Sequence, residues 1–423
     1  EYSYDFSGNI VSFKDGNKNI TEYNYDGLGR VLKRVSPEGS TKEYRYDYMG
    51  NIEKLIFSGA YGSDVVREYK HDSEGNLIQT ISPLGNKTNF TYDKMGNLLL
   101  SEDARGEITE YTYDKVYNNT GIKTREEENI YTYDKTGNVL TAKGKEGTVS
   151  FTYDRLYRII KAVNEKNKEI LYSYDKAGNL LKTVYTDGKE VNRSYDPLGN
   201  LASIKDAGGK MIFYTRDGEG KLIKKEYPDG STTEYDYNGA GLLAQQKEVD
   251  HKGITKRQTL LGYDDNGNIK LKHREGVFGK EETVKYIYDK DNRLVKLIKT
   301  GTMITTGVSG KSGMPQSGTL TLIREYKYDR AGNILSDGEN TYEYDIENHL
   351  TCKKGKRGNK KYRYDRSGNL IEELIVEEGK EKSNVKYTYD SLGRFLKGKN
   401  AKGEESTYTY NALGARIRNV QLR

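Results

Sequence analysis

The chain has 423 residues, of which only 34% are hydrophobic, and its mean hydropathy is −0.90. This composition excludes a large conventional apolar core, whereas the 38 tyrosines exclude a disordered chain, since disordered chains are poor in aromatic residues. The net charge of +6 arises from 69 basic and 63 acidic residues that are interspersed, so it does not indicate nucleic-acid binding over the whole surface.

Simple counts exclude two further classes of protein. The only cysteine, Cys352, excludes an internal disulfide framework. No run of 18 apolar residues exists, so the sequence predicts no membrane-spanning helix. The chain starts inside a repeat, without an initiator Met or a signal peptide, and stops just after another copy, so we expect a segment of a longer protein.

A tyrosine–aspartate pair followed by a turn recurs about every 21 residues along the chain. It occupies 19 positions in register, and 15 of them keep both residues. Because a fixed period of this length is typical of repeat proteins, the sequence predicts a single array of about 19 repeats over residues 1–423. Residues that recur so often are predicted to build the structure and not an active site. The clearest copies of the motif contain Tyr25, Asp26, Gly29, Tyr46, Asp47, Gly50, Tyr92, Asp93, Gly96, Tyr133, Asp134, Gly137, Tyr174, Asp175, Gly178, Tyr328, Asp329, Gly332, Tyr364, Asp365 and Gly368.

Residues 88–114 show how one repeat is built. Residues 88–92 alternate and are rich in β-forming side chains, which predicts a strand. Residues 93–96 have Asp first and Gly fourth, as in a type I turn closed by a left-handed Gly, and the Asp carboxylate can accept a backbone N–H two residues on. Residues 97–102 return as a second strand, and 103–106 form a second turn of the same kind. Since no helical periodicity persists anywhere, the sequence predicts an all-β, continuous antiparallel hairpin meander.

The tyrosines and the width of the sheet predict its form. In the Tyr-x-Tyr-Asp version of the motif, as at Tyr44 and Tyr46, both rings lie on one face, so stacked repeats would form rows of rings whose cross-strand pairs contribute roughly 0.2–1 kcal/mol each. Two strands in each of 19 repeats give about 38 strands, and strand twist prevents such a sheet from staying flat. We expect it to coil into a spiral, hollow, shell-like superhelix. The length suits about one and a half turns around a small folded domain, so the spiral should remain open.

The array departs from its period at a few places. The widest interval, 40 residues between Tyr288 and Tyr328, contains an insertion at 300–319 that is rich in Gly, Ser and Thr. It is interpreted as a long hairpin tip or a decayed repeat, with a projecting partner-binding loop as the alternative. Shorter groups of extra residues fall near 57–64, 247–256, 275–282 and 376–384.

Four copies of the motif replace the turn glycine. Tyr117 and Tyr157 stand where a positive φ is costly for a bulky residue, so these two turns are predicted to have a different geometry. Asn292 and Asn348 are easier substitutions at that position.

Few segments suggest binding chemistry. Residues 263–268 and 289–292 resemble calcium loops but lack the twelve-residue pattern with a terminal Glu, so ordinary turns are favoured. The basic run 353–361 spans a second turn and is interpreted as a solvated hairpin tip, with binding of nucleic acid or an anionic cell-wall polymer as the alternative. No phosphate-loop, nucleophile-elbow or zinc-protease motif occurs, so the sequence predicts no catalytic, cofactor-binding or metal site. The four histidines lack metal-ligand spacing and are interpreted as structural: His71, His251, His273 and His349.

Tyr-Asp-x-x-Gly-Asn/Arg, followed by aliphatic residues at a period near 21, resembles the YD repeat of the Rhs family, and the resemblance covers essentially the whole chain. Teneurins, the B and C components of insecticidal toxin complexes and bacterial polymorphic toxins carry such repeats. The resemblance implies a β-strip that spirals into a hollow shell, which in the toxin members encloses a C-terminal toxic domain. It also implies an association with carbohydrate binding.

The end of the family's pattern is missing. Toxin-releasing members close the shell with a core segment that has Asp-Pro motifs and often a self-cleaving aspartyl site. Residues 389–396 resemble its start, but Lys397-Gly398-Lys399 follow without Asp-Pro, and the only Asp-Pro, at 196–197, fits an ordinary repeat turn. We therefore expect this chain to lack the plug, the cleavage site and the toxin.

These observations favour a non-enzymatic structural segment of a large exported bacterial Rhs/YD-repeat protein. Its predicted partners are a passenger or toxin domain of the same full-length protein, or neighbouring shell segments, and its predicted location is secreted or at the cell surface. The alternative is a surface adhesin that binds glycans or a partner protein through tyrosine rows or the 300–319 insertion. Nucleic acid is not an expected partner, and no cofactor is expected.

Overall fold

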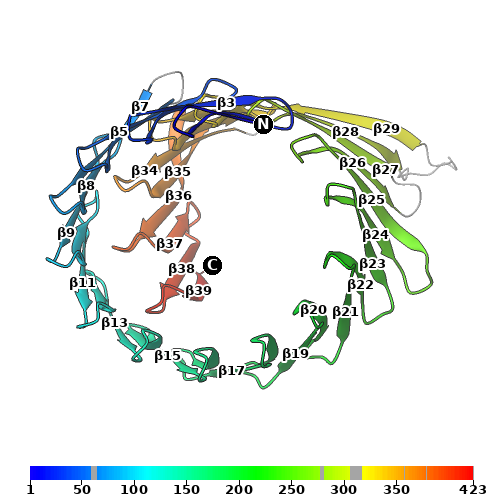
Figure 1. Cartoon of the computed structure of the whole chain (residues 1–423), viewed down its shortest axis with the longest axis horizontal. Helices are drawn as coiled ribbons and strands as arrows, with labels where there is room; N and C mark the ends of the chain where they lie inside the picture. Colours follow the sequence, from blue (N-terminus) through cyan, green and yellow to red (C-terminus); the bar gives the residue numbers. More distant parts are fainter. Residues whose placement is uncertain (59–63, 277–280, 305–316, 357, 378, 423) are drawn as a thin grey trace. The chain divides into compact units, whose positions relative to one another are not determined.

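The computed structural model describes residues 1–58, 64–276, 281–304, 317–356, 358–377 and 379–422. Within these ranges the chain forms 39 β-strands and no helix. Figure 1 shows how the strands follow one another side by side in the order of the sequence. No helix in the described part of the chain is long and apolar enough to cross a membrane. The all-β prediction is confirmed.

The strands are short, and most of them have five to eight residues. The first sixteen are β1 (Tyr2–Tyr4), β2 (Ile10–Lys14), β3 (Ile20–Tyr25), β4 (Val31–Val35), β5 (Thr41–Tyr46), β6 (Ile52–Ser58), β7 (Asp64–His71), β8 (Leu77–Ile81), β9 (Lys87–Tyr92), β10 (Leu98–Glu102), β11 (Ile108–Tyr113), β12 (Asn119–Lys123), β13 (Glu128–Tyr133), β14 (Val139–Gly144), β15 (Gly147–Tyr153) and β16 (Ile159–Val163).

The next strands lengthen toward the end of the first sheet. They are β17 (Glu169–Tyr174), β18 (Leu180–Val184), β19 (Glu190–Tyr195), β20 (Leu201–Lys205), β21 (Met211–Arg216), β22 (Leu222–Glu226), β23 (Thr232–Tyr237), β24 (Leu243–Val249), β25 (Thr255–Tyr263), β26 (Ile269–Gly276), β27 (Glu281–Tyr288), β28 (Leu294–Ile304) and β29 (Ser317–Glu325).

A second sheet follows. Its strands are β30 (Lys327–Tyr328), β31 (Ile334–Ser336), β32 (Asn340–Tyr344), β33 (Leu350–Gly355), β34 (Asn359–Tyr364), β35 (Leu370–Glu377), β36 (Lys380–Tyr389), β37 (Phe395–Asn400), β38 (Glu405–Tyr410) and β39 (Arg416–Leu422).

The pairing is that of a meander. Strands next to each other in sequence pair antiparallel, for example Lys33 with Glu43 between β4 and β5, in one sheet of 29 strands and another of 10. At the motif the register shifts by one residue, so that Tyr25 ends β3 opposite Val31, the first residue of β4. The motif turns therefore all lie at one edge of their sheet, and the second turn of each repeat lies at the opposite edge. These shifts are β-bulges, which raise the local twist.

The chain divides into two compact units. One comprises residues 1–13, 20–169 and 327–423, and the other comprises 14–19 and 170–326. The single array of about 19 repeats remains a prediction, since strand pairing divides between two sheets after β29.

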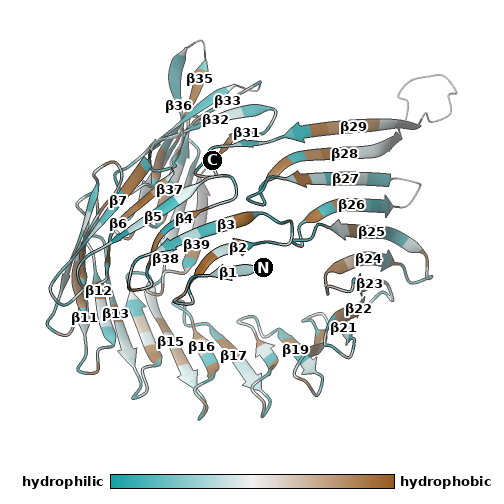
Figure 2. Cartoon of the chain, turned by 45° about the horizontal axis from the view of Figure 1, so that its top comes forward, coloured by the Kyte–Doolittle hydropathy of each residue, from teal (hydrophilic) through white to brown (hydrophobic). Residues whose placement is uncertain are grey.

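Little of the chain is buried. The buried apolar side chains in the described ranges are small or medium in size, among them Val65, Ala142 and Val149, and several buried positions are polar, such as Thr109 and Asn129. Figure 2 shows apolar and polar segments mixed along the strands instead of one continuous apolar face. The low hydrophobic content thus corresponds to a thin wall of paired strands, in which backbone hydrogen bonds replace a deep core.

The predicted irregularities are partly described. The extra residues at 247–256 lengthen β24 and β25, which meet in an ordinary second turn where Gly253 donates its N–H to Asp250. The flanks of the 300–319 insertion continue as paired strands as far as Ile304 opposite Ser317, which favours the hairpin interpretation. Residues 305–316 lie outside the described residues. So do 59–63, 277–280, 357 and 378, which belong to the irregular segments near 57–64, 275–282 and 376–384 and to the basic run 353–361.

Candidate functional site

The described residues contain no cluster of three or more His, Cys, Asp or Glu side chains that could hold a metal ion. In the 263–268 loop, the Asp264 carboxylate accepts N–H groups of Asn266 and Asn268 instead of pointing at a common centre. The three histidines with polar contacts are separate: His71 approaches Asp47 at 3.8 Å, His273 bonds Thr283 at 2.8 Å, and His349 bonds Asp345 at 3.1 Å. The recurring polar chemistry lies instead in the motif turns.

The motif aspartate fixes each turn. In the turn after β9, Oδ1 of Asp93 accepts the backbone N–H of Met95 at 2.8 Å and of Asn97 at 2.9 Å, and Oδ2 accepts the Asn97 side-chain amide at 2.8 Å. The side-chain and backbone hydrogen bonds from Asn97 hold the pKa of Asp93 below its usual range. Asn238 replaces Asp in a later copy and accepts the same two backbone N–H groups, both at 3.0 Å. The ordinary turn predicted at Asp196-Pro197 has the same bonds, with Asp196 accepting from Leu198 and Asn200.

The fourth position of the turn takes a positive φ. The seven motif glycines named from the sequence all lie there, with φ between 76° at Gly29 and 95° at Gly50. Asn292 and Asn348 adopt it too, as expected, with φ of 62° and 66°. The side chain of Asn292 accepts a hydrogen bond of 2.8 Å from Asn268 of the preceding motif turn.

The prediction of a different geometry at Tyr117 and Tyr157 is wrong. Both tyrosines take the glycine conformation, with φ of 67° and 61°. Tyr117 still donates its N–H to Asp114 at 3.1 Å, and Asp114 still accepts from Val116 and Asn118. The aspartate's hydrogen bonds hold the backbone in the turn, and the tyrosine ring lies exposed beyond it.

The tyrosine of the motif connects one repeat to the preceding one. Its hydroxyl donates a hydrogen bond to the carbonyl oxygen of the first residue of the strand after the preceding motif turn, as from Tyr46 to Val31 at 2.9 Å and from Tyr113 to Leu98 at 2.9 Å. Among the described residues, the motif tyrosines that make this bond include Tyr25, Tyr46, Tyr92, Tyr113, Tyr133, Tyr153, Tyr195, Tyr237, Tyr263, Tyr288, Tyr344, Tyr364, Tyr389 and Tyr410.

The prediction that rows of stacked tyrosines stabilise the sheet is therefore wrong. Motif tyrosines of consecutive repeats lie two strands apart, roughly 10 Å, which exceeds the 4.5–7 Å of aromatic pairs. The ring packs instead on the residue that follows the preceding turn: Arg30 lies 4.4 Å above the Tyr46 ring, and His349 stacks on Tyr364 at 4.7 Å. That residue also lies close to the next turn, since a Cβ on Gly50 would lie 3.3 Å from Arg30.

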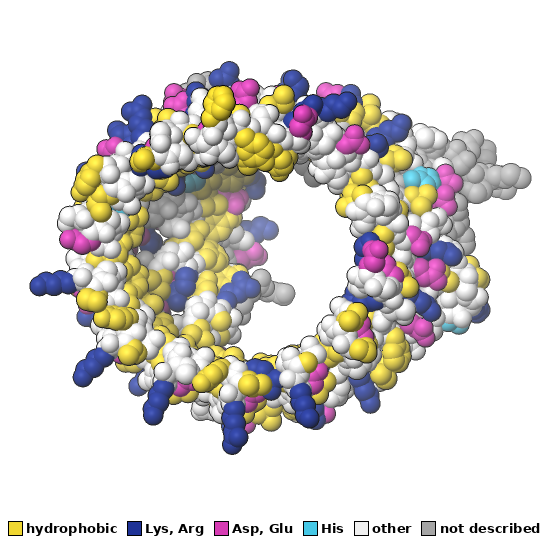
Figure 3. All heavy atoms as spheres, viewed as in Figure 1, with side chains coloured by type: hydrophobic (Ala, Val, Ile, Leu, Met, Phe, Trp, Pro, Cys, Tyr) yellow, Lys and Arg dark blue, Asp and Glu magenta, His cyan; other side chains and the backbone are white. Residues whose placement is uncertain are grey.

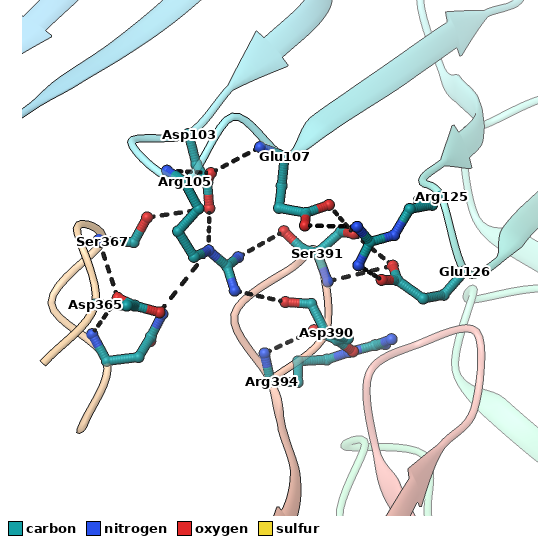
Figure 4. A network of polar contacts seen from close by, with 11 residues as sticks. Asp103, Arg105, Glu107, Arg125, Glu126, Asp365, Ser367, Asp390, Ser391 and Arg394 are labelled. Atoms are coloured by element: carbon teal, nitrogen blue, oxygen red, sulfur yellow. Dashed lines mark hydrogen bonds and ion pairs between the residues drawn. The ribbon is translucent and has the colours of Figure 1, made fainter. Parts of the chain in front are cut away.

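A second polar site, which we call the seam, lies in the unit that contains β3–β16 and β30–β39. Here second turns of early repeats meet motif turns of repeats about 250–290 residues later. Figure 4 shows its centre: Arg105 donates to the carbonyl oxygens of Asp390 at 3.1 Å and Ser391 at 3.2 Å, and its Nε lies 2.7 Å from Asp103. Ser367 donates to Asp103 at 3.1 Å. The seam thus joins two parts of the strip edge to edge.

Charged groups close the seam on the other side of Ser391. Its hydroxyl donates to Glu107 at 2.7 Å, and it also bonds Glu126. Arg394 pairs with Glu127 and with Asp390, both at 2.6 Å. Burial disfavours the Arg394 charge, but these two hydrogen bonds outweigh burial and raise its pKa. A half-buried cation paired with two carboxylates in this way holds a specific register, because removal of one partner leaves charge unpaired.

The seam continues on both sides of this centre. Ser40 donates to the carbonyl of Arg330 at 2.7 Å, and Tyr131 donates to that of Ala412 at 2.7 Å. The other unit has the same kind of contact, where Asn266 donates to Asp15 at 2.7 Å and Asn17 to Asp264 at 3.0 Å.

The sequence analysis missed the seam. The motif turns of the seam give no local signal for it. Ser391 and Ala412 are small, but Leu392 and Leu413 follow them, at the same position of the turn as Leu28 and Met95 outside the seam. The described residues of the 353–361 run contribute a pair between Lys361 and Glu381 at 2.7 Å, so this cation is compensated within the sheet.

Comparisons with known proteins agree with this architecture. A family model described as "Teneurin YD-shell" matches residues 1–118, 41–181, 101–240 and 231–419. No curated protein sequence matches the chain. The crystal structure of TcdB2-TccC3-Cdc42 matches with a TM-score of 0.60 at 14% identity, covering 100% of this chain and 28% of that chain. TcdB2-TccC3-TEV gives 0.58 at 14%, with 100% and 28% covered, and TcdB2-TccC3 without its hypervariable C-terminal region gives 0.56 at 14%, with 100% and 29%. These likenesses show the fold, and this chain spans less than a third of each of those chains.

Proposed function

Because the chain belongs to the teneurin YD-shell family, we propose that it forms part of the wall of a large exported bacterial Rhs/YD-repeat protein and encloses or scaffolds a passenger domain, such as a toxin. The wall acts passively, as a barrier of paired strands between an interior and the solvent. No step in this role requires a catalytic group. Neighbouring shell segments of the same protein are its further partners.

The seam is the observation that carries this proposal. A barrier must be closed between adjacent stretches of the strip, and a row of free turns would leave gaps. At the seam, Arg105, Ser391 and Arg394 close the contact with charged and carbonyl partners at 2.6–3.2 Å. Hydrogen bonds to ionised groups are the stronger kind, so such an edge resists opening.

Protease protection in the full-length protein tests enclosure. The passenger should resist protease while the wall is intact and should become cleavable when Arg105→Glu opens the seam. Arg155→Glu is the matched control, because Arg155 is an exposed arginine of the same unit and lies outside the seam, whereas the Arg105 side chain is 17% exposed. A passenger that is cleaved equally in the native protein and in both variants would sink the proposal.

Small-angle X-ray scattering of the 423-residue chain tests the wall itself. A compact globule of this length has a radius of gyration of about 22 Å. A hollow wall places its mass far from its centre and gives a larger value, with a distance distribution shifted to long distances. A value near that of the globule would contradict a shell.

One groove favours the second candidate function, glycan binding by an adhesin. It has a volume of about 690 Å³ in the unit that contains β18–β29, and its lining includes Tyr227, Tyr235, Asp229 and Asp250. Aromatic faces with carboxylates nearby suit the apolar faces and hydroxyls of sugars. Screening of the chain on a glycan array, with Tyr235→Ala as the matched variant, tests this. Absence of binding, or binding that Tyr235→Ala leaves unchanged, would count against it.

A further inference from the structure

Four consecutive motif turns of the unit that contains β3–β16 have a cation at the same position of their tips. They connect β9 to β10, β11 to β12, β13 to β14 and β15 to β16, so all four lie at one edge of one sheet. Directly after the motif aspartate each has a cation: Lys94, Lys115, Lys135 or Arg155. All four cations are exposed, and no carboxylate in the described ranges lies within ion-pair distance of them. We call these turns the basic rim.

Apolar side chains project beside these cations. Met95, Val116 and Leu156 follow Lys94, Lys115 and Arg155, and their side chains are 68%, 72% and 66% exposed. Leu28 and Leu198 are just as exposed in motif turns without a cation, so the rim is distinguished by the combination of an exposed apolar residue with an adjacent exposed cation in successive turns. In Figure 3, Lys and Arg side chains project from the surface beside the strands that Figure 1 labels β11–β15.

Two strained tyrosines belong to the same rim. Tyr117 and Tyr157 have positive φ and are 54% and 57% exposed. A non-glycine residue in this conformation costs stability and gains no burial here, and such strain tends to occur where function requires it. Tyrosine is also a side chain that favours the boundary between water and lipid, because it has an apolar body and a polar tip.

Each rim cation shares its turn with an ionised, half-buried motif aspartate, so the rim is distinguished by the exposed position of its cations and not by a large net charge. The only acids in these four turns are the motif aspartates, and they accept hydrogen bonds from their own turns, as Asp114 does from Val116 and Asn118. The rim therefore presents cations, aliphatic tips and phenol rings to the solvent, at intervals of roughly 10 Å from one turn to the next.

We propose that the basic rim docks on the surface of an anionic lipid bilayer. The cations lie at the level of the headgroups, and the apolar tips and tyrosines insert just below them, as in interfacial membrane binding. Separate tips at such intervals suit a fluid bilayer, whereas a folded partner would need a pocket for each. Nucleic acid would bind the cations, but its binding would not require exposed apolar side chains such as Met95, Val116 and Leu156. Membrane docking is a function additional to that of the wall, and it does not require a passenger domain.

Co-sedimentation with vesicles tests this. The probes are vesicles of phosphatidylcholine with about a third phosphatidylserine, and vesicles of phosphatidylcholine alone. We expect the chain to sediment with the anionic vesicles only, and less so as salt is raised, because salt screens the attraction. Replacing the four rim cations by Gln should lower the partition coefficient at least about 100-fold, since each cation near an anionic surface contributes about a factor of five. Met95→Ser, Val116→Ser and Leu156→Ser together should lower it about tenfold without changing charge.

The matched control removes four exposed cations from second turns and strands of the same unit: Lys166, Lys168, Lys382 and Lys402, each replaced by Gln. It has the same net charge as the rim variant and should bind as the native chain does. Circular dichroism checks that each variant keeps its β-structure. Equal loss of binding in both charge variants, no sedimentation with anionic vesicles, or binding of duplex DNA in place of vesicles would each overturn the proposal.

A fluorescent reporter tests insertion directly. The chain has no tryptophan, so Leu156→Trp supplies a single reporter at the rim and Lys166→Trp supplies one at a second turn. Anionic vesicles should shift the emission of the Trp at position 156 to shorter wavelength and leave that at 166 unchanged. Binding without a shift at 156 would contradict insertion of the apolar tips.

Discussion

The hydroxyl group of Tyr92 donates a hydrogen bond of 3.0 Å to the carbonyl oxygen of Leu77, a residue 15 positions earlier in the chain. Leu77 begins β8, the strand that follows the preceding motif turn. The two residues of the motif therefore have different ranges of action: Asp93 orders its own turn, and Tyr92 attaches that turn to the repeat before it. Repeat proteins derive their stability from such nearest-neighbour contacts.

Loss of one tyrosine hydroxyl should loosen one junction between repeats. Tyr113→Phe removes the bond of 2.9 Å to Leu98 and keeps the ring. We expect a local loss of about 1 kcal/mol, because the partly buried carbonyl loses its partner. Amide hydrogen exchange in β10–β12 would measure it. Tyr48→Phe is the control, since Tyr48 is 91% exposed and outside this bond. An equal effect of the two substitutions would refute the connecting role of the motif hydroxyl.

The sequence predicted the strands, the two turns and the meander, because each depends on residues within one repeat. Alternation and the Asp-x-x-Gly pattern are local signals, and the hydrogen bonds of Asp93 follow from them. The tyrosine bond was not predicted, since a ring that shares a face with its neighbour suggests stacking until the spacing between strands is known. The seam could not be predicted from a repeat at all, because Arg105 and Ser391 are 286 residues apart in the sequence and meet only in the folded unit.

Asparagine should be tolerated in place of the motif aspartate, because Asn238 already occupies this position in one repeat. Asp93→Asn keeps an oxygen that can accept from Met95 and Asn97, as Asn238 accepts from Ala240 and Leu242. Asp93→Ala removes the acceptor and leaves both N–H groups to water. We therefore expect Asp93→Ala to lower the urea midpoint clearly more than Asp93→Asn does. If the two variants unfold at the same urea concentration, the carboxylate does not fix the turn.

Stability should persist into mild acid and fall only below it. Side-chain hydrogen bonds from the following asparagine, first among the causes, hold the pKa of Asp93, Asp134 and Asp175 below their usual range. A carboxyl group with a lowered folded pKa stabilises the fold above its unfolded pKa of about 3.9, and this contribution is lost as pH falls through the lower folded value. The urea midpoint should be nearly constant from neutral pH to about 4 and decrease below that. A steep decrease already between neutral pH and 5 would contradict the assignment to these aspartates.

The seam should open when its central cation is removed. Arg105→Met eliminates the bonds to the carbonyls of Asp390 and Ser391 and leaves Asp103 with one partner fewer. We expect a local loss of about 2–3 kcal/mol, because hydrogen bonds from charged groups are worth more than neutral ones. Hydrogen exchange at 390–394 should accelerate by about 30–150-fold, while β10 and β11 stay protected. Arg155→Met is the control and should change little, since Arg155 is exposed and lies outside the seam. Faster exchange throughout β10 and β11 as well would mean that the variant unfolds the sheet instead of opening the seam.

Replacing a strained tyrosine by glycine should raise the stability of the chain and lower its binding to vesicles. Tyr117→Gly removes a side chain held at φ of 67° and should stabilise the turn by about 0.5–1 kcal/mol, because glycine adopts this conformation without steric cost. The reverse exchange at the equivalent position, Gly137→Ala, should destabilise its turn, since φ is 88° there and the added Cβ would lie 3.4 Å from Asn118. Urea midpoints measure both effects, and vesicle sedimentation of Tyr117→Gly should fall severalfold although the chain is more stable. If Tyr117→Gly lowers stability, then the ring makes a contact that outweighs its backbone strain, and the tyrosine is kept for the fold and not for the rim.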